Sequence, residues 1–158
     1  ELIASTVEAG VVFDTMLFTV QKEAAERITA RPDNKNYTAF SVLCSLFYEC
    51  KIVKTIPASA FWPQPNVESA AVLFKAKKEF AEYKNFKLFI KIVKALFSSR
   101  RKNIKNNLGS WMKSNGCGDK IDLVLEKAGL SGNLRAESLA LYDFLLLSDI
   151  ISSLDKNK

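Results

Sequence analysis

Strand-type sequence is confined to the first half of this 158-residue chain, and this division limits the folds that the chain can adopt. Apolar and β-branched runs of strand length occur at 13–20, 50–56 and 68–74. From about residue 79 onward, apolar residues recur at helical spacing instead, with Gly and Asn between the runs. We therefore predict an α/β part over residues 1–78 and a small all-helical domain over residues 79–158.

The order of elements in the first part is typical of the distal edge of an α/β sheet. Residues 1–9 indicate the end of a helix, and the apolar run at 13–20 suits a strand buried on both faces of a parallel sheet. Helices are predicted over 21–30 and about 37–47. The strands at 50–56 and 68–74 have no long crossover between them, so we expect them to pair antiparallel. The sheet's earlier strands would lie outside this chain.

The second part begins with an amphipathic helix whose outer face is entirely basic. Apolar residues between Phe86 and Phe97 share one helical face. Further helices are predicted over Arg100–Met112, Ile121–Ala128 and Glu137–Ser153, with Ser98 or Ser99 as a cap for the first of them. The residues of the basic face are Lys84, Lys87, Lys91 and Lys94.

Composition argues against several classes of site. The chain has no histidine, which removes Ser-His and Cys-His nucleophilic schemes. Its three cysteines have no CxxC spacing, so neither a disulfide framework nor a metal site such as zinc is expected. Cys44 lies on an apolar face and is interpreted as core filling.

The beginning of the chain has no targeting pattern. No run of eighteen apolar residues occurs, and ELIASTVEAG lacks the order of charged, apolar and small residues that marks a signal peptide. We therefore expect a cytoplasmic protein. The first residue is Glu1, and the sequence there resembles the middle of a helix, so we expect the chain to be part of a longer protein.

Positive charge is concentrated in one stretch. Between Lys75 and Lys105 there are eleven basic residues and two acidic ones, a net +9 in a chain of net +6, which leaves −3 for the remainder. Clustered Lys and Arg favour a polyanionic partner because they displace counterions from phosphate backbones. The alternative, equally compatible with composition, is a solvated lysine-rich helix face.

Prolines stiffen the segment PASAFWPQPNVES at 57–69. Pro63 and Pro65 fix φ at two positions and favour extended conformations at Trp62 and Gln64, which predicts a polyproline-like strut. Such a strut would hold Phe61 and Trp62 at the edge of the sheet, where rigid rings suit base stacking. The alternative is that both rings are core residues beneath a proline turn.

This segment also carries a family resemblance. The pattern F-x-P-x-P-x-V-x-S, followed by an apolar strand, resembles the end of the catalytic domain in KsgA-type and Erm-type rRNA adenine N6-methyltransferases. Three other segments are similar to the same family in the same order: MLFTVQKEAAERI at 16–28, FSSRRKNIKNNL at 97–108 and LRAESLALYDF at 134–144. Together they cover nearly the whole chain.

The resemblance implies a fold and a set of roles. The fold would be the distal part of a Rossmann-like methyltransferase sheet followed by a small helical domain that grips rRNA. Phe61 would stack on the flipped-out target adenine, with Pro63 and Pro65 shaping its loop. Basic residues would contact rRNA phosphates: Lys84, Lys87, Lys91, Lys94, Arg100, Arg101, Lys102 and Lys105.

The cofactor of the family is S-adenosylmethionine, and this chain lacks the residues that would hold it. Neither the Gly-rich loop with its acidic residues nor the N-L-P-Y type motif occurs in the sequence. The resemblance therefore implies that the parent protein dimethylates small-subunit (16S) rRNA in ribosome biogenesis, while this chain alone is inactive. We expect a monomer, without a metal and without a membrane partner.

Three alternatives remain open at this point. An Erm-type enzyme would act on large-subunit rRNA instead. A non-catalytic RNA-binding module would account for the missing cofactor site. A membrane-surface helix over 84–97 is disfavoured, because its apolar residues are needed to bury the helical domain.

Overall fold

The computed structural model describes residues 2–9, 11–77 and 83–155. The chain divides into two compact units. The sheet unit takes Glu1–Arg31 and Asn36–Glu82, and the helical unit takes Pro32–Lys35 and Tyr83–Lys158. The domain boundary predicted at residues 78–79 lies outside the described residues. The short loop Pro32–Lys35 groups with the helical unit, which the sequence did not indicate.

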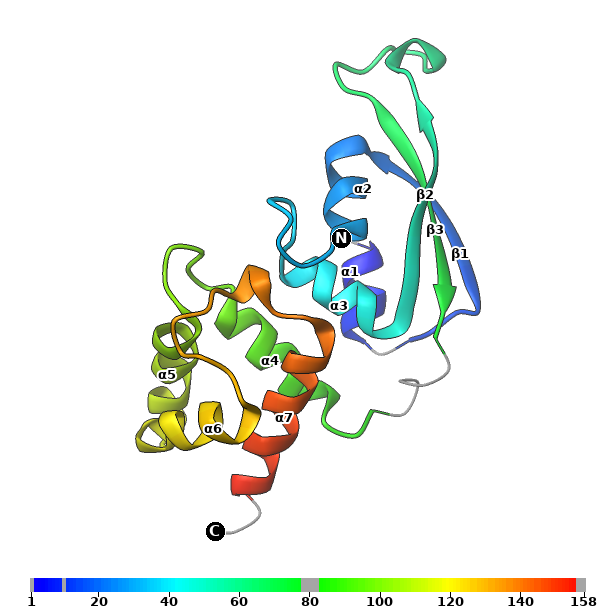
Figure 1. Ribbon diagram of the computed structural model, residues 1–158. Helices are drawn as coiled ribbons and strands as arrows, with labels where there is room; N and C mark the ends of the chain where they lie inside the picture. Colours follow the sequence, from blue (N-terminus) through cyan, green and yellow to red (C-terminus); the bar gives the residue numbers. More distant parts are fainter. Residues whose placement is uncertain (1, 10, 78–82, 156–158) are drawn as a thin grey trace. The chain divides into compact units, whose positions relative to one another are not determined.

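The sheet unit is a three-stranded antiparallel sheet with the order β1-β3-β2. Its strands are β1 (Thr15–Gln21), β2 (Tyr48–Ile56) and β3 (Ser69–Ala76). Three helices cover one of its faces (Figure 1): α1 (Leu2–Glu8), α2 (Lys22–Thr29) and α3 (Ala39–Phe47). The predicted antiparallel pairing of the last two strands is confirmed, and so are the helices near 21–30 and 37–47.

The core of this unit forms around Phe74 on the central strand. Phe74 is fully buried, and two rings from the flanking strands meet it edge-on: Phe18 at a centroid distance of 5.9 Å and Tyr48 at 5.7 Å. Edge-to-face pairs of this kind add to the free energy gained by burying the rings. Cys44 is also fully buried, which confirms its interpretation as a core residue.

The prediction that β1 is buried on both faces of a parallel sheet is wrong for this chain. β1 pairs antiparallel with β3, and its residues alternate between exposed and half-buried. The helices cover only one face, so alternate side chains point to solvent, and Leu17 is 63% exposed.

The helical unit consists of α4 (Phe86–Leu96), α5 (Ile104–Ser114), α6 (Ile121–Ala128) and α7 (Leu141–Asp155), with short 3-10 turns at Gly118–Lys120 and Ala136–Ser138. Its core takes apolar residues from all four helices: Phe89, Ile92, Val93, Leu96, Ile104, Leu108, Met112, Val124, Phe144, Leu147 and Ile151. Phe97 stacks on Phe144 at a centroid distance of 6.0 Å. The apolar face of α4 is thus used for packing, as the sequence predicted.

Two helices begin later than predicted because polar side chains cap them further along. The helix predicted from Arg100 begins at Ile104, where the side chain of Asn103 accepts a hydrogen bond from the Asn106 amide at 2.9 Å. The last helix begins at Leu141 rather than Glu137, and the Asp143 carboxylate accepts from the Ala140 amide at 2.8 Å. Residues 100–102 consequently form a turn between α4 and α5.

Candidate functional site

The loop 57–68 projects from the end of the sheet where all three strands stop. Ser69 of β3 lies opposite both Gln21 of β1 and Ile56 of β2, so the strands end at one level. The loop begins with a 3-10 turn over Ala58–Ala60, in which the Ala60 amide donates to the Pro57 carbonyl at 3.0 Å. The chain then bends, with a cis peptide between Trp62 and Pro63.

The segment is therefore not the continuous polyproline-like strut that the prolines predicted. A hydrogen-bonded turn precedes the prolines, and the Phe61 amide donates to the Ala58 carbonyl at 3.2 Å. The difference arises because Ala58–Ala60 contains no proline and is free to form a 3-10 turn. The two rings that follow differ sharply in exposure, since Phe61 is half-buried and Trp62 is 97% exposed. Pro65 is half-buried and Pro63 is exposed.

An ion pair attaches this loop to the start of α2. The Lys22 ammonium lies 2.7 Å from a Glu68 carboxylate oxygen, and the Lys22 amide donates to the Glu68 carbonyl at 3.0 Å. The hydrogen bond to Glu68, together with the charge of Glu68, raises the pKa of Lys22. The two segments Gln21–Glu23 and Val67–Glu68 border a hollow of about 290 Å³. Two sequence segments 46 residues apart thus meet at one place, which spacing alone did not reveal.

The basic residues predicted from the sequence are all exposed on the helical unit. Lys87, Lys91 and Lys94 lie on α4, and Lys84 directly precedes it. Arg100, Arg101 and Lys102 lie in the turn before α5, and Lys105 lies in the first turn of α5. Arg100 donates to the Lys35 carbonyl at 2.9 Å, and Lys105 lies 2.6 Å from Asp122. We call these eight residues the basic surface.

A buried amide holds the arginine-containing turn in place. The Asn107 side chain donates to the carbonyls of Leu96 at 2.7 Å and Ser99 at 2.9 Å, and Ser98 donates back to it at 3.3 Å. Asn107 is only 3% exposed, so these bonds lie in a low-dielectric setting and fix the end of α4 and the turn that follows. The sequence analysis did not identify this role of Asn107.

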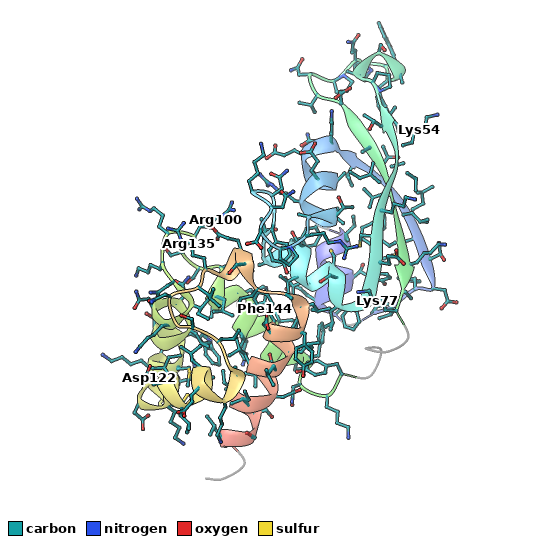
Figure 2. All side chains as sticks on the ribbon, in the orientation of Figure 1. Lys54, Lys77, Arg100, Asp122, Arg135 and Phe144 are labelled. Carbon is teal, nitrogen blue, oxygen red and sulfur yellow. The ribbon has the colours of Figure 1, made fainter. Side chains whose placement is uncertain are left out.

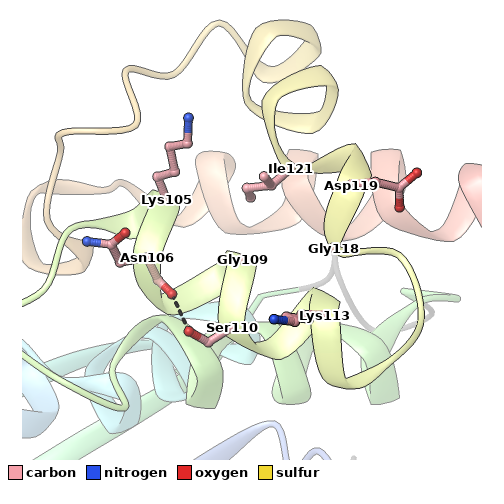
Figure 3. A pocket seen from close by; sticks show the side chains of 8 residues that line it. All are labelled: Lys105, Asn106, Gly109, Ser110, Lys113, Gly118, Asp119 and Ile121. Carbon is pink, nitrogen blue, oxygen red and sulfur yellow. Dashed lines mark hydrogen bonds between the residues drawn. The ribbon is translucent and has the colours of Figure 1, made fainter.

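A groove of about 510 Å³ runs along α5 (Figure 3). Lys105 and Lys113 lie on α5 at two points along it, and Asp119 and Ile121 border it from the following turn and α6. Gly118 has to be glycine for this arrangement, because a Cβ there would lie 2.8 Å from the Lys113 Cα. The groove extends the polar side of α5 beyond the basic surface.

A second hollow, of about 530 Å³, surrounds Arg100. It is lined by the loop Pro32–Lys35 and by residues 133–138, which bring Lys35 and Arg135 to the same place as Arg100. Figure 2 shows Arg100 and Arg135 on neighbouring loops of the helical unit. Arg135 lies 4.0 Å from Glu137, whose second carboxylate oxygen is buried and has no hydrogen-bond partner in the described structure. Nothing in the sequence of the loop 32–35 indicated that it would lie next to Arg100 and residues 133–138.

Thiol chemistry is not favoured in the sheet unit. Burial raises the pKa of the Cys44 thiol strongly and that of Cys50 to about 12, so both remain protonated near neutral pH. In the part of the chain that the structure describes, no group of three or more metal-binding side chains occurs. Within that same part, no helix is both long and apolar enough to cross a membrane.

Comparison with known proteins places the chain in a family. Residues 1–153 match the family described as ribosomal RNA adenine dimethylase. The chain belongs to this family. Among its curated relatives, the ribosomal RNA small subunit methyltransferase A of Treponema denticola is 96% identical over 154 residues, which cover 98% of the chain and 53% of the relative. The protein of the same name from Treponema pallidum (strain Nichols) is 38% identical over 96% of the chain and 54% of the relative.

Solved structures of similar fold are also methyltransferases by name. A dimethyladenosine transferase from Plasmodium falciparum matches with a TM-score of 0.79 and 23% identity, over 98% of this chain and 62% of that one. The 23S rRNA methyltransferase ErmE matches with a TM-score of 0.62 and 19% identity, over 95% of this chain and 59% of that one. These two structural similarities show the fold of the chain and nothing of its function. The chain spans about half the length of the curated adenine dimethylase relatives that it matches.

Proposed function

We propose that this chain forms part of an S-adenosylmethionine-dependent rRNA adenine N6-dimethyltransferase that acts on small-subunit rRNA in ribosome biogenesis. The observation that carries the proposal is the family match over residues 1–153. The name of the 96% identical relative from Treponema denticola favours the small subunit over the large one. The parent protein is proposed to act as a monomer.

In this proposal the sheet unit is the distal part of a Rossmann-like methyltransferase sheet, over residues 1–78, and residues 79–158 form the rRNA-gripping domain. The exposed side chains of β1 support the first assignment. Within the described residues β1 pairs only with β3, and Leu17 is 63% exposed. Further strands of the parent would pair with the outer edge of β1, and further elements would cover Leu17.

Phe61 is proposed to stack on the target adenine after that base leaves the RNA helix. Adenine N6 is inaccessible to a methyl donor while the base is stacked and paired, so the base has to be extruded. A half-buried ring on a hydrogen-bonded loop suits this role, because its own ordering costs little at binding. Pro63 and Pro65 would keep the loop in this shape.

The basic surface is proposed to contact phosphates and so to orient the rRNA. All eight side chains are exposed, and the turn that carries Arg100, Arg101 and Lys102 is fixed by Asn107. Contacts to phosphates position a nucleic acid without reading its sequence. Selection of the target adenine would therefore come from elsewhere in the enzyme.

We propose that the described residues of this chain do not by themselves form a site for S-adenosylmethionine. Five of the six glycines lie between Gly109 and Gly132 in the helical unit, and the sixth is Gly10, which lies outside the described residues. The described sheet unit therefore offers no glycine-rich loop at a strand end of the kind that approaches such cofactors closely. We propose that the cofactor site lies in the rest of the parent and that this chain alone does not catalyse methyl transfer.

The test is methylation by the full-length parent. The enzyme is incubated with methyl-labelled S-adenosylmethionine and with unmodified small or large ribosomal subunits. We expect label in N6-methylated adenine of small-subunit rRNA. Label confined to the large subunit would instead assign an Erm-type activity, and absence of label with retained RNA binding would leave a non-catalytic RNA-binding module.

A further inference from the structure

Trp62 is the most exposed large hydrophobic side chain of the described residues. It is 97% exposed, compared with 70% for Tyr142, the next most exposed. Such a ring contributes almost nothing to the packing of its own unit, since its apolar surface remains in water. The proposed function assigns a role to its neighbour Phe61 and none to Trp62.

The loop that carries Trp62 is bonded at both of its ends. Before Trp62, the Phe61 amide is bonded to the Ala58 carbonyl at 3.2 Å. After it, the loop returns to β3 through Glu68, which is tied to Lys22 at 2.7 Å. The ring is therefore presented to solvent on a loop that is hydrogen-bonded at both ends, which reduces the entropy lost when a partner binds to it.

The two neighbouring rings have different environments. Phe61 is half-buried, whereas Trp62 is 97% exposed. Trp62 is therefore available for a contact separate from the one assigned to Phe61.

The surroundings of Trp62 suit a single flat ring better than a protein surface. The other large exposed hydrophobic residues of the hairpin are Val53 and Val67, at 48% each. A stable protein interface buries roughly 800 Å² per partner around a contiguous apolar centre, which one ring and two valines do not supply. A nucleobase needs only one ring face.

The exposed charges of β2, the strand that leads to the loop, are mostly basic, which favours a polyanion. Lys51 and Lys54 are exposed on β2, and Lys54 lies on the arm of the hairpin that leads to the loop (Figure 2). The acidic residue at the base of the loop, Glu68, is neutralised by Lys22. The acidic residue of β2, Glu49, lies opposite Lys75 at the far end of the strand.

We propose that Trp62 is a second base-stacking position, which holds an unpaired RNA base next to the one assigned to Phe61. The proposal rests on the proposed function, because it takes RNA as the partner. It adds a separate contact, since the indole grips a flanking base that is not itself modified. Stacking on Trp62 would select RNA that is unpaired around the target.

The two tryptophans of the chain, Trp62 and Trp111, make a direct test possible. The variant Trp111→Phe retains only Trp62, and the matched variant Trp62→Phe retains only Trp111. Each is titrated with single-stranded oligoadenylate and with duplex RNA of equal length, and indole fluorescence and acrylamide quenching are recorded. We expect single-stranded RNA to quench and shield Trp62, with no comparable change for Trp111 or with duplex.

Affinity provides the second measurement. We expect Trp62→Ala to weaken binding of single-stranded RNA about 5- to 150-fold, the equivalent of about 1–3 kcal/mol for one stacked base, and to leave duplex binding unchanged. Trp62→Phe should recover part of the loss. Equal loss for duplex, unchanged single-strand affinity, or a blue shift of Trp62 with anionic phospholipid vesicles but not with RNA would overturn the proposal. If Arg100→Ala with Arg101→Ala still weakens RNA binding in any of these cases, the proposed function survives and only the second stacking position fails.

Discussion

Among the described residues, the sheet unit exposes six large apolar side chains and the helical unit exposes two, Leu123 and Tyr142. The sheet unit leaves rings and aliphatic groups in solvent, including Phe13 at 53%, Leu17 at 63% and Trp62 at 97%. The helical unit buries nearly all of the apolar face of α4 and exposes lysine and arginine. In the proposed function, the exposed ring of Trp62 and the neighbouring ring of Phe61 would contact individual bases, and the exposed charges of the helical unit would contact the RNA backbone.

The two candidate surfaces are also held in place differently. The turn of Arg100–Lys102 is fixed from inside by the buried amide of Asn107, whereas the loop of Phe61 is fixed from outside by the exposed pair Lys22 and Glu68. A buried hydrogen-bond network is costly to break, and an exposed ion pair is not. The helical unit should therefore be the more rigid presenter of its contacts.

The largest expected effect concerns the core on which the basic surface is built. Phe89→Ala removes a fully buried ring from α4, and we expect it to cost about 3–5 kcal/mol of unfolding free energy. Lys91→Ala on the exposed face of the same helix should change stability by no more than about 0.5 kcal/mol. Urea denaturation gives the free energies, and hydrogen exchange shows which unit opens. If the sheet unit opens together with the helical unit in Phe89→Ala, the two units are not independent.

The next effect tests the aromatic side of the comparison. In the full-length parent, we expect Phe61→Ala to lower turnover about 5- to 150-fold, the equivalent of losing about 1–3 kcal/mol of stacking on the target base. Affinity for rRNA should change little, because phosphate contacts supply most of it. Phe61→Tyr keeps the ring and is the matched control. Equal losses of turnover and affinity would contradict the division between the two surfaces.

Much of the fold was predictable from the sequence because it depends on periodicity and on short-range pairing. The antiparallel pair β2 and β3 and the packing face of α4 follow from apolar spacing and from a short connection. Helix starts were predicted at Arg100 and Glu137, but both helices begin later. The side chains of Asn103 and Asp143 cap them there, and the apolar spacing did not show this. Spacing also could not show that β1 has one covered face in this chain, since that depends on which other elements are present.

The candidate site was less predictable than the fold, because the contacts that hold its loops in place join residues that are far apart in the sequence. Lys22 and Glu68 both stand in recognisable motifs, yet nothing in the spacing of 46 residues indicates that they pair. Asn107 lies near the start of α5, and its role depends on the carbonyls of Leu96 and Ser99 at and after the end of α4. The prediction of a polyproline-like strut was wrong because Pro63 and Pro65 constrain only themselves and the residues directly before them. They do not constrain the 3-10 turn over Ala58–Ala60.

A smaller effect tests the charged side of the comparison. Arg100→Ala with Arg101→Ala should reduce the slope of log affinity against log salt by about two units, since two phosphate contacts are lost. Lys127→Ala on α6 removes a charge outside the basic surface and is the control. Filter binding of rRNA at several salt concentrations measures the slope. A slope that falls equally in the control would mean that net charge, rather than this surface, grips the RNA.

The smallest effect concerns the exposed pair that holds the aromatic loop. Glu68→Gln should return the pKa of Lys22 towards its ordinary value of 10.5, because the hydrogen bond and the charge of Glu68 are what raise it. The control Glu49→Gln, at the far end of β2, should leave that pKa unchanged, and NMR titration of the Lys22 ammonium measures both.

A raised pKa means that the stabilisation from the pair is complete below pH 10.5 and is lost as pH rises through the raised value in the folded state. Near neutral pH the unfolding midpoint of Glu68→Gln should therefore move only slightly, as expected for a solvent-exposed pair. If Glu68→Gln lowers turnover as much as Phe61→Ala does, the loop that carries Phe61 depends on this charge pair for its function.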